Sequence, residues 1–532
     1  MRSHRRRCPL PAVCCAIVLG GCSTLPGRDY PRPPSAPLAN PPNPALLQPL
    51  AGAGRAHRAE SGFRLYSVGV DGLLLRLELI AQAHSSLDLQ YYIYHGDESG
   101  RLVTEALATA AARGVRVRIL VDDAATVAGD EQLFALAARP NVEMRVFNPW
   151  RYRGHNRFVR GVEYLIGFRR LDYRMHNKLF IADGAIGLVG GRNIGDQYFQ
   201  VDPESQFADE DVLATGPVVQ DLAATFEEFW SSDAAIPAQA LLPAADTGEA
   251  AVQLARRTTS AHKAATAGGN YQQKLATGEP LASVLTGESQ LAWARAEVAC
   301  DSPDKGKRVA AGASVSGLLF APVAREIRAT HSELTIVSPY VVPTDGELRL
   351  LEERRAVGST VRILTSSLEA TDSLPAQAGY MHYRVPLLDA GVQLYEIRAR
   401  PQSSRGTGQS ARLSRYGNYG LHAKLLVFDR SGVYVGSMNY DQRSRRLNTE
   451  NGLIIHSPEL AEQALRRFAA MTQPQNAYAI TLEPQQAGDS PALLWSTVEA
   501  GQPVSLRSEP ARSSWQKLAA HFLELLPLDR EL

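Results

Sequence analysis

The sequence predicts an α/β protein built from two duplicated lobes, each a mixed β-sheet flanked by helices. Two observations predict this architecture. A strand-helix-strand pattern occurs twice, and equivalent residues of its two copies, such as Val117 and Val361, are 244 positions apart. A motif of ionisable residues also occurs twice, and its two histidines, His176 and His422, are 246 positions apart. Because the two offsets agree, we infer that one lobe was duplicated.

Each copy consists of a strand, a helix and a second strand. The strand segments contain alternating or continuous apolar residues, and the helical segments have apolar residues at helical spacing and end at a glycine. In chain order the segments are 85–94, 100–114 and 115–123 in the first copy, and 332–341, 345–358 and 360–367 in the second. This order indicates a sheet covered by helices.

Changes in composition divide the chain into six expected segments. In chain order these are a lipoprotein signal peptide (1–22), a Pro-rich tether (23–61), the first lobe (62–235), an inter-lobe connection that is partly flexible (236–311), the second lobe (312–475) and a C-terminal tail with an amphipathic helix (476–532).

The first 22 residues have the pattern of an export signal, with several arginines before an apolar run that ends at Cys22. The run is much shorter than the ~20 apolar residues that span a bilayer. The sequence "LGGC" resembles the lipobox of bacterial lipoproteins, which implies that Cys22 is acylated. We therefore expect a lipid-anchored protein of the bacterial cell envelope, and Ser23 favours the periplasmic face of the outer membrane. An ordinary secretory signal is the alternative.

Charge and cysteine content exclude several classes of function. The 56 Lys and Arg residues balance 55 Asp and Glu residues, so the chain lacks the basic excess of nucleic-acid-binding proteins. Beyond the signal peptide and Cys22, Cys300 is the one remaining cysteine, which excludes an intramolecular disulfide or a Cys-based metal site. We expect no metal and no cofactor.

The repeated motif has the sequence HxKx4D, followed after seven positions by GxxN. Its members are His176, Lys178, Asp183 and Asn193 in the first copy, and His422, Lys424, Asp429 and Asn439 in the second. Side chains two positions apart on a strand point to the same side, so each His and Lys should face one cleft. If the lobes pack face to face about a pseudo-twofold axis, the two copies converge. Such a cationic site, rich in hydrogen-bond donors, suits the transition state of phosphodiester chemistry.

Lysine usage supports a special role for two motif positions. The chain has only seven lysines, and two of them are Lys178 and Lys424. This indicates that a compact ammonium group is required there rather than the planar guanidinium of arginine.

The doubled motif resembles the phospholipase D superfamily over residues 62–475. The surrounding sequences "MHNKLFIADGAIGLVGGRNIGDQYF" and "FADEDVLATGP" are most similar to the cardiolipin synthase branch, particularly the bacterial type C enzymes. One departure from the superfamily pattern is Gly191, where many members have Ser; the second copy keeps Ser437. The resemblance implies two phospholipase D-like lobes with one active site at their interface.

The resemblance also implies a two-step mechanism without a metal. One histidine attacks phosphorus to form a phosphohistidine, and the other acts as general acid and then as general base. By analogy we assign His176 as nucleophile and His422 as acid/base. The phosphoryl group would be held by Lys178, Lys424, Asn193, Asn439 and Ser437. Glu450 and Asp209 would orient the imidazoles, whereas Asp183 and Asp429 are expected to brace the site.

The function that the resemblance implies is a phosphatidyltransferase. It would form cardiolipin at a membrane surface from phosphatidylglycerol and a second phospholipid, such as phosphatidylethanolamine. A hydrolytic phospholipase D or an endonuclease is the alternative, since the motifs do not separate transfer from hydrolysis. The intact doubled motif disfavours a non-enzymatic envelope protein.

Three further segments bear on membrane contact. Residues 148–170 contain six arginines and five aromatic residues with Glu163 as the single acid, which favours contact with an anionic bilayer over a solvated basic loop. Residues 400–420 are expected to form a flexible rim or lid. Residues 513–528 place Trp515, Leu518, Phe522 and Leu525 on one helical face. The favoured interpretation is a helix that packs on its own protein, and a membrane-surface helix is the alternative.

Overall fold

A computed structural model of the chain describes residues 30–31, 54, 56–123, 130–152, 157–201, 205–241, 275–276, 278–287, 290–312, 318–399, 418–483 and 492–526. The signal peptide with Cys22, most of the tether and residues 400–417 of the expected rim lie outside the described residues. Among the helices of the described ranges, none is both long and apolar enough to cross a bilayer.

The first lobe is a mixed sheet. In spatial order its strands are β1 (Ser61–Tyr66), β8 (Asp211–Thr215), β6 (Ile186–Gly190), β5 (Leu179–Ala182), β2 (Ser86–Tyr91), β3 (Arg116–Asp122), β4 (Val142–Phe147) and β9 (Ala235–Pro237). The pairs β2–β3 and β3–β4 are parallel, and the other pairs are antiparallel.

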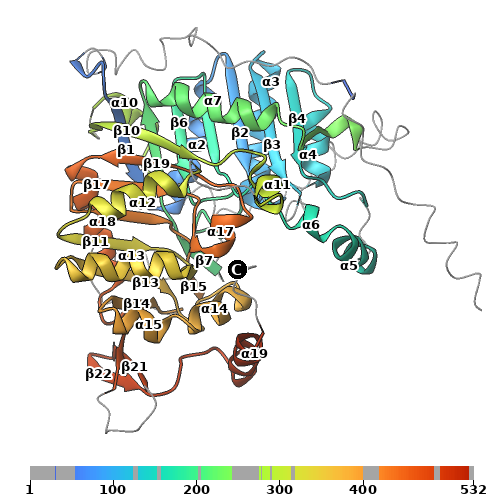
Figure 1. The fold of residues 1–532 in the computed structure, drawn as a ribbon. Helices are drawn as coiled ribbons and strands as arrows, with labels where there is room; N and C mark the ends of the chain where they lie inside the picture. Colours follow the sequence, from blue (N-terminus) through green and yellow to red (C-terminus); the bar gives the residue numbers. More distant parts are fainter. Residues whose placement is uncertain are drawn as a thin grey trace, which may run out of the picture.

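The second lobe repeats this arrangement strand for strand. Its spatial order is β10 (Ala292–Cys300), β19 (Asn451–His456), β17 (Gly432–Gly436), β16 (Leu425–Phe428), β11 (Glu333–Val337), β13 (Thr360–Ser366), β14 (Gln393–Ile397) and β20 (Ala477–Leu482). The sheet then continues through β21 (Leu493–Glu499) and β22 (Gln502–Leu506), beyond residue 475. The structure therefore confirms the predicted fold of two duplicated α/β lobes (Figure 1).

Helices cover the outer face of each sheet. In the first lobe these are α2 (Gly69–Gln82), α3 (Glu98–Ala112) and α4 (Asp130–Ala137), and in the second they include α12 (Phe320–Ala329) and α13 (Asp345–Ala356). Local sequence fixes the ends of α3 and α13. Asp97 and Thr344 cap their first turns, and Gly114 and Gly358 follow their last turns with φ of 96° and 92°.

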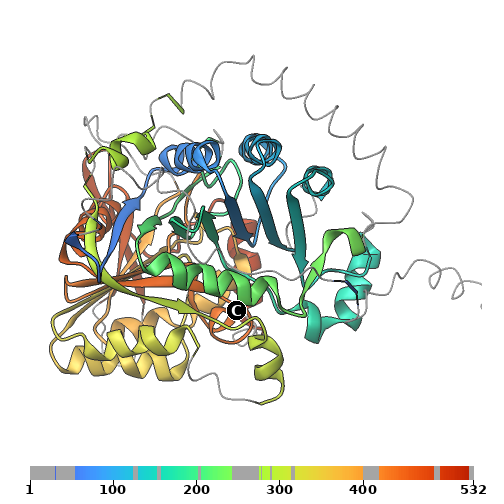
Figure 2. The same cartoon turned by 90° about the horizontal axis from the view of Figure 1, so that it is seen from above.

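The inner faces of the two lobes share one core. The helices α7 (Val218–Trp230) and α18 (Pro458–Met471) contribute to the same cluster of buried side chains as both sheets. In Figure 2 the green α7 lies on the face of the first sheet opposite the row of blue helices. In addition, β1 pairs antiparallel with β10, which joins the two sheets edge to edge. The two motifs are thus carried by sheets that share one core and one strand pairing.

The strand assignment of the motif requires a correction. The prediction placed His176 and Lys178 on a strand, but β5 begins at Leu179 and β16 begins at Leu425. The His and Lys residues lie in the extended segments just before these strands. The reason is that the backbone N–H groups of the two histidines donate to the other lobe, His176 to Thr449 O and His422 to Ala208 O, instead of to a strand of their own sheet.

Candidate active site

Each motif histidine lies in a segment that crosses to the other lobe. His176 N donates to Thr449 O at 2.9 Å, and Thr449 N donates to Arg174 O at 2.9 Å. On the opposite side, β15 (Asn418–Leu421) pairs in parallel with β7 (Ser205–Ala208), and His422 N donates to Ala208 O at 2.8 Å. His176 is therefore held beside Thr449, which precedes Glu450, and His422 is held beside Ala208, which precedes Asp209.

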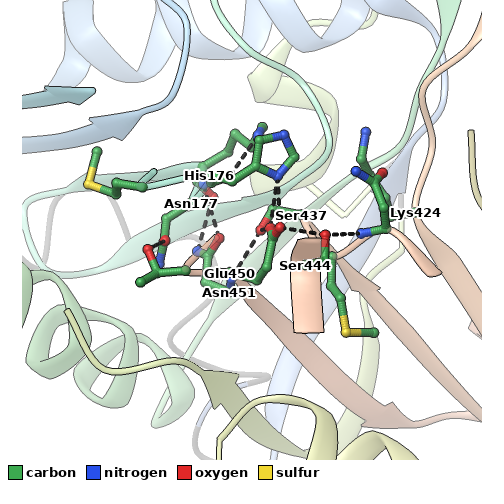
Figure 3. Close-up of polar contacts among 12 residues, drawn as sticks. His176, Asn177, Lys424, Ser437, Ser444, Glu450 and Asn451 are labelled. Carbon is green, nitrogen blue, oxygen red and sulfur yellow. Dashed lines mark hydrogen bonds and ion pairs between the residues drawn. The ribbon is translucent and has the colours of Figure 1, made fainter. Parts of the chain in front are cut away.

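The carboxylates consequently pair with the histidines across the lobe interface. His176 Nδ1 lies 2.8 Å from Glu450 Oε2, and His422 Nδ1 lies 2.6 Å from Asp209 Oδ2. Both carboxylates are fully buried. Figure 3 shows Glu450 directly beside the His176 ring. When the Nδ1–H group donates a hydrogen bond to the carboxylate, Nε2 keeps its lone pair and the ring orientation is fixed.

The two carboxylates have different surroundings. Glu450 accepts hydrogen bonds from the Ser437 hydroxyl and, at 2.8 Å, from the Ser444 hydroxyl (Figure 3). Burial nevertheless raises the pKa of Glu450, although Lys178 and the two hydroxyls partly offset this. Asp209 accepts from the backbone N of Glu210 at 2.8 Å. Burial also acts to raise the pKa of Asp209, but the neighbouring His422 and Lys424 outweigh burial and lower it.

Both motif lysines are buried beside the histidines. Lys178 Nζ donates to His176 O at 2.6 Å, and Lys424 Nζ lies 3.0 Å from His422 Nδ1. Burial lowers the pKa of Lys178 well below its usual value, and it lowers the pKa of Lys424 to about 8, with partial compensation by nearby carboxylates. The site thus concentrates positive charge with little solvent to screen it.

The same environment disfavours the charged form of both imidazoles. Burial, followed by the charges of Lys178 and Lys424, lowers the pKa of His176 well below 6.5. Burial and Lys424 also lower the pKa of His422, but the Asp209 carboxylate opposes this shift. Of the two rings, His422 is therefore the one whose carboxylate partner clearly supports a protonated state.

The remaining predicted phosphoryl ligands differ in their contacts. Asn193 Oδ1 accepts from Ile93 N at 3.1 Å, whereas its Nδ2 is buried and makes no hydrogen bond within the described part of the chain. The Oδ1 atom of Asn439 is likewise buried and makes no hydrogen bond within the described residues. The Ser437 hydroxyl donates to Glu450 and accepts from Asn451 N at 3.0 Å. Ser437 therefore contacts the orienting carboxylate.

Asp183 and Asp429 lie at the opposite ends of the strands that the histidines precede. Asp183, in the turn after β5 with φ of 52°, accepts hydrogen bonds from three successive backbone N–H groups, those of residues 84–86 at the start of β2. Asp429 does the same for residues 331–333 at the start of β11. These contacts brace the sheet of each lobe, and neither carboxylate is placed with the imidazoles.

Sequence reasoning missed several residues of the site. The rings of Tyr92 and Tyr198 contact His176 and His422 edge-on, with centroids 5.0 and 5.1 Å apart. Behind Glu450, Asp301 accepts from Glu450 N at 3.0 Å and forms a buried ion pair with Lys305 at 2.7 Å. The rarity of lysine could have pointed to Lys305. Of the seven lysines in the chain, Lys305 is the third that lies at this site, after Lys178 and Lys424.

The structure explains why the first copy has glycine where the second has Ser437. A Cβ atom at Gly191 would lie 2.1 Å from Asp209 Oδ1. We expect Gly191→Ser to displace Asp209 from His422 and to lower turnover by about 10 to 100-fold. Gly346→Ser is the matched control, because a Cβ there meets nothing closer than 3.8 Å. Steady-state rates of both variants test this, and full activity of Gly191→Ser would contradict it.

The buried ion pair behind Glu450 predicts a large effect on stability. Lys305→Met leaves Asp301 charged and buried without its partner, and we expect it to lower the free energy of unfolding by about 3–5 kcal/mol. Lys307→Met, on the same helix α11 (Lys305–Ala310) but exposed, should change it by less than about 0.5 kcal/mol. Urea denaturation of the two variants provides the measurement, and equal midpoints would refute the expectation.

Comparison with known proteins identifies the family. Residues 77–230 and 323–472 match the sequence model of the family described as "Cardiolipin synthase, PLD-like domain". The chain is 36% identical over 475 residues to cardiolipin synthase C of Escherichia coli K12, covering 89% of this chain and 96% of the relative. It is 25% identical over 403 residues to the major cardiolipin synthase ClsA of Bacillus subtilis 168, covering 75% and 66%.

Among solved structures, the fold is similar to that of phosphatidylserine synthase from Haemophilus influenzae Rd KW20. The TM-score is 0.51 at 14% sequence identity, and the match covers 80% of this chain and 91% of that one. This similarity concerns the fold. Together with the family match over both lobes, it leads to one conclusion: the chain belongs to the cardiolipin synthase family of phospholipase D-like enzymes.

Proposed function

We propose that the protein is a phosphatidyltransferase that forms cardiolipin from phosphatidylglycerol and a second phospholipid through a phosphohistidine. The observation that supports this most directly is the pair of carboxylate-oriented imidazoles, His176–Glu450 and His422–Asp209, beside two buried lysines. Its relatives named cardiolipin synthases, 36% and 25% identical, support the choice of product.

In the first step, Nε2 of His176 attacks phosphorus of the donor lipid, and the bond from phosphorus to the headgroup oxygen breaks. Protonated His422 gives its proton to the departing alkoxide. The anionic phosphodiester itself favours this protonated form, because it adds negative charge beside a ring that Asp209 already stabilises as a cation. Lys178, Lys424 and the amide of Asn193 hold the phosphoryl oxygens.

In the second step, neutral His422 removes the proton from a hydroxyl of phosphatidylglycerol. The resulting oxygen attacks phosphorus, the phosphorus–nitrogen bond breaks, and His176 is regenerated with its lone pair. The low pKa of His176 suits both steps, since the ring must be neutral as nucleophile and a competent leaving group afterwards.

The test is a lipid analysis. Purified protein is incubated with vesicles of phosphatidylglycerol and phosphatidylethanolamine, each isotopically labelled in its headgroup, and the products are identified by mass spectrometry. Cardiolipin that is lost in both His176→Ala and His422→Ala supports the proposal, and the released headgroup identifies the donor. Phosphatidic acid without cardiolipin would establish hydrolysis instead.

We further propose that the protein is lipid-anchored through Cys22 in the bacterial envelope, facing the periplasm. The "LGGC" sequence before Ser23 supports this. Fractionation of cells that express wild type or Cys22→Ala tests it, together with mass spectrometry of the mature N-terminus. An unmodified N-terminus at another residue would refute acylation.

The shifted lysine pKa predicts the pH dependence of turnover. Lys424, with a pKa of about 8, is protonated below that pH and loses its charge above it. Because the ammonium stabilises the phosphoryl oxygens, we expect kcat to fall as the pH rises through about 8. On the acid side, activity should persist below pH 6.5, since His176 stays neutral there. A profile of kcat measured from pH 5 to 10 tests both expectations. If the fall in kcat above pH 8 is unchanged in Lys424→Arg, another group is responsible for it.

A further inference from the structure

The C-terminal helix α19 (Ser514–Glu524) packs on its own protein through an unexpected face. It lies against α14 (Leu374–Met381) with Ala520 fully buried. Gln516 Nε2 donates to Leu368 O at 2.7 Å, and the backbone O of Glu524 lies 3.0 Å from His382 Nε2. The contact face is thus small and polar.

The apolar face of α19 points away from the protein. Trp515, Leu518, Phe522 and Leu525 are 78%, 59%, 63% and 81% exposed. The sequence favoured a helix that packs on its own protein, but the apolar face is not the face that packs. The helix does pack on its own chain, but the four apolar side chains do not take part, because residues 516, 520 and 524 occupy the contact face.

A second exposed apolar face lies on α5 (Arg157–Ile166), where Leu165 and Ile166 are 77% and 84% exposed. Among the described residues, the large apolar side chains that are exposed lie on α5, α6 (Phe168–Leu171) and the segment from Trp515 to Leu526, with the single exception of Val357. Their concentration on two segments distinguishes them from scattered surface leucines, which are common in soluble proteins.

The surroundings of α5 are cationic. Glu163, the one acid of residues 148–170, accepts hydrogen bonds from Arg151 N at 2.7 Å and Tyr152 N at 2.9 Å and pairs with Arg170 at 3.4 Å. Its charge is thus compensated internally. Arg151 is exposed, and Arg160 lies over the Trp150 ring at 5.1 Å. On the other segment, Arg512 is exposed just before α19.

Both helices project from the same side of the molecule in Figure 1, α5 from the first lobe and α19 from the second. The strands β7 and β15, which lead to Asp209 and His422, lie to the left of both helices in this view. Both apolar helices thus lie on one side of the strands that carry the site residues.

We propose that α5 and α19 together form an interfacial surface, named here the two-helix surface, that seats the active site on an anionic phospholipid bilayer. Apolar side chains would enter the boundary of the acyl chains, Trp515 would lie at headgroup level, and the arginines would contact lipid phosphates. A second copy of the chain is a poorer occupant, because two surfaces of the same positive sign repel each other. The inference rests on the proposed function only in taking lipid as the substrate.

The test uses the full-length chain with Cys22→Ala as common background, so that no acyl chain anchors it. Binding to phosphatidylglycerol/phosphatidylethanolamine vesicles is measured by sedimentation, and the depth of Trp515 by quenching with brominated acyl chains, with Trp515→Phe as the blank. We expect the Leu518→Ser/Phe522→Ser/Leu525→Ser triple variant and the Leu165→Ser/Ile166→Ser double variant each to weaken binding by about tenfold or more. Val357→Ser, the matched control on an exposed apolar residue elsewhere, should bind as the parent does.

A soluble substrate separates this inference from the proposed function. With a short-chain phosphatidylglycerol below its micelle concentration, both surface variants should keep the parental rate, while their rate on vesicles falls with binding. Vesicle binding that is lost in the variants would support the surface even if no cardiolipin forms. Binding and Trp515 quenching that are unchanged in the variants would overturn it, as would a change from dimer to monomer in solution without any change in vesicle binding.

Discussion

With a substrate whose leaving group needs no proton, replacement of His422 by alanine is expected to stop turnover and to leave a phosphatidyl group bound to His176. The reason is the division of roles between the two rings. Without His422, no base activates the incoming hydroxyl, so the second step is lost. We expect a loss of about 10^4-fold in kcat, the upper range for a general acid–base group.

The leaving group decides whether the first step can still be observed. A natural headgroup needs a proton from His422, but p-nitrophenol leaves as a stable anion without one. With a p-nitrophenyl phosphatidyl ester, His422→Ala should therefore release one equivalent of p-nitrophenolate per active site and then stop. His176→Ala should release none, because it lacks the nucleophile. A burst in His176→Ala and none in His422→Ala would reverse the assignment.

The covalent product gives an independent measurement. Intact-mass analysis of His422→Ala after the burst should show an added phosphatidyl group that is labile in acid, as expected of a phosphoramidate. His456→Ala is the matched control, because His456 is an exposed ring at the end of β19. It should turn over at the parental rate and accumulate no adduct.

Much of the fold was predictable because it depends on local patterns that occur twice. The nearly equal offsets of the strand-helix-strand units and of the two motifs predicted matching lobes, and the strand orders confirm this. The ends of α3 and α13 follow from glycines that adopt positive φ. The family match likewise follows from residues that are adjacent in sequence and spaced by the motif.

The crossed pairing of the site was not predictable in this way. Glu450 follows His422 in sequence, yet it contacts His176, since the partner is set by backbone hydrogen bonds between residues 174–176 and 449. The same is true of Gly191, whose missing side chain makes room for Asp209. For α19, periodicity predicted which residues share a face, but the direction of that face depends on the docking of residue 520 against α14.

The pairing of each histidine with a carboxylate of the other lobe predicts different effects for the two carboxylates. We expect Glu450→Gln to slow the burst step, because Glu450 orients the nucleophile His176. Asp209→Asn should leave the burst nearly intact and slow the steady state, because Asp209 orients His422 and supports its protonated form. Each loss should be about 10 to 100-fold, the usual cost of removing an orienting carboxylate. Pairing within one lobe would exchange the two phenotypes.

Double-mutant cycles test the crossing without assuming which ring is the nucleophile. Residues that act on one another are non-additive, whereas independent ones add. In a His422→Ala background, Asp209→Asn should cost nothing further in the residual steady-state rate, although it slows the steady state when His422 is present, while Glu450→Gln should still slow the residual rate by its full factor. The converse cycle pairs His422 with Glu450 and Asp209 with His176, and it should be additive. Because the two carboxylates come from opposite lobes, the observed coupling would also show that neither lobe contains a complete site, so catalysis requires the interface that β1 and β10 hold together.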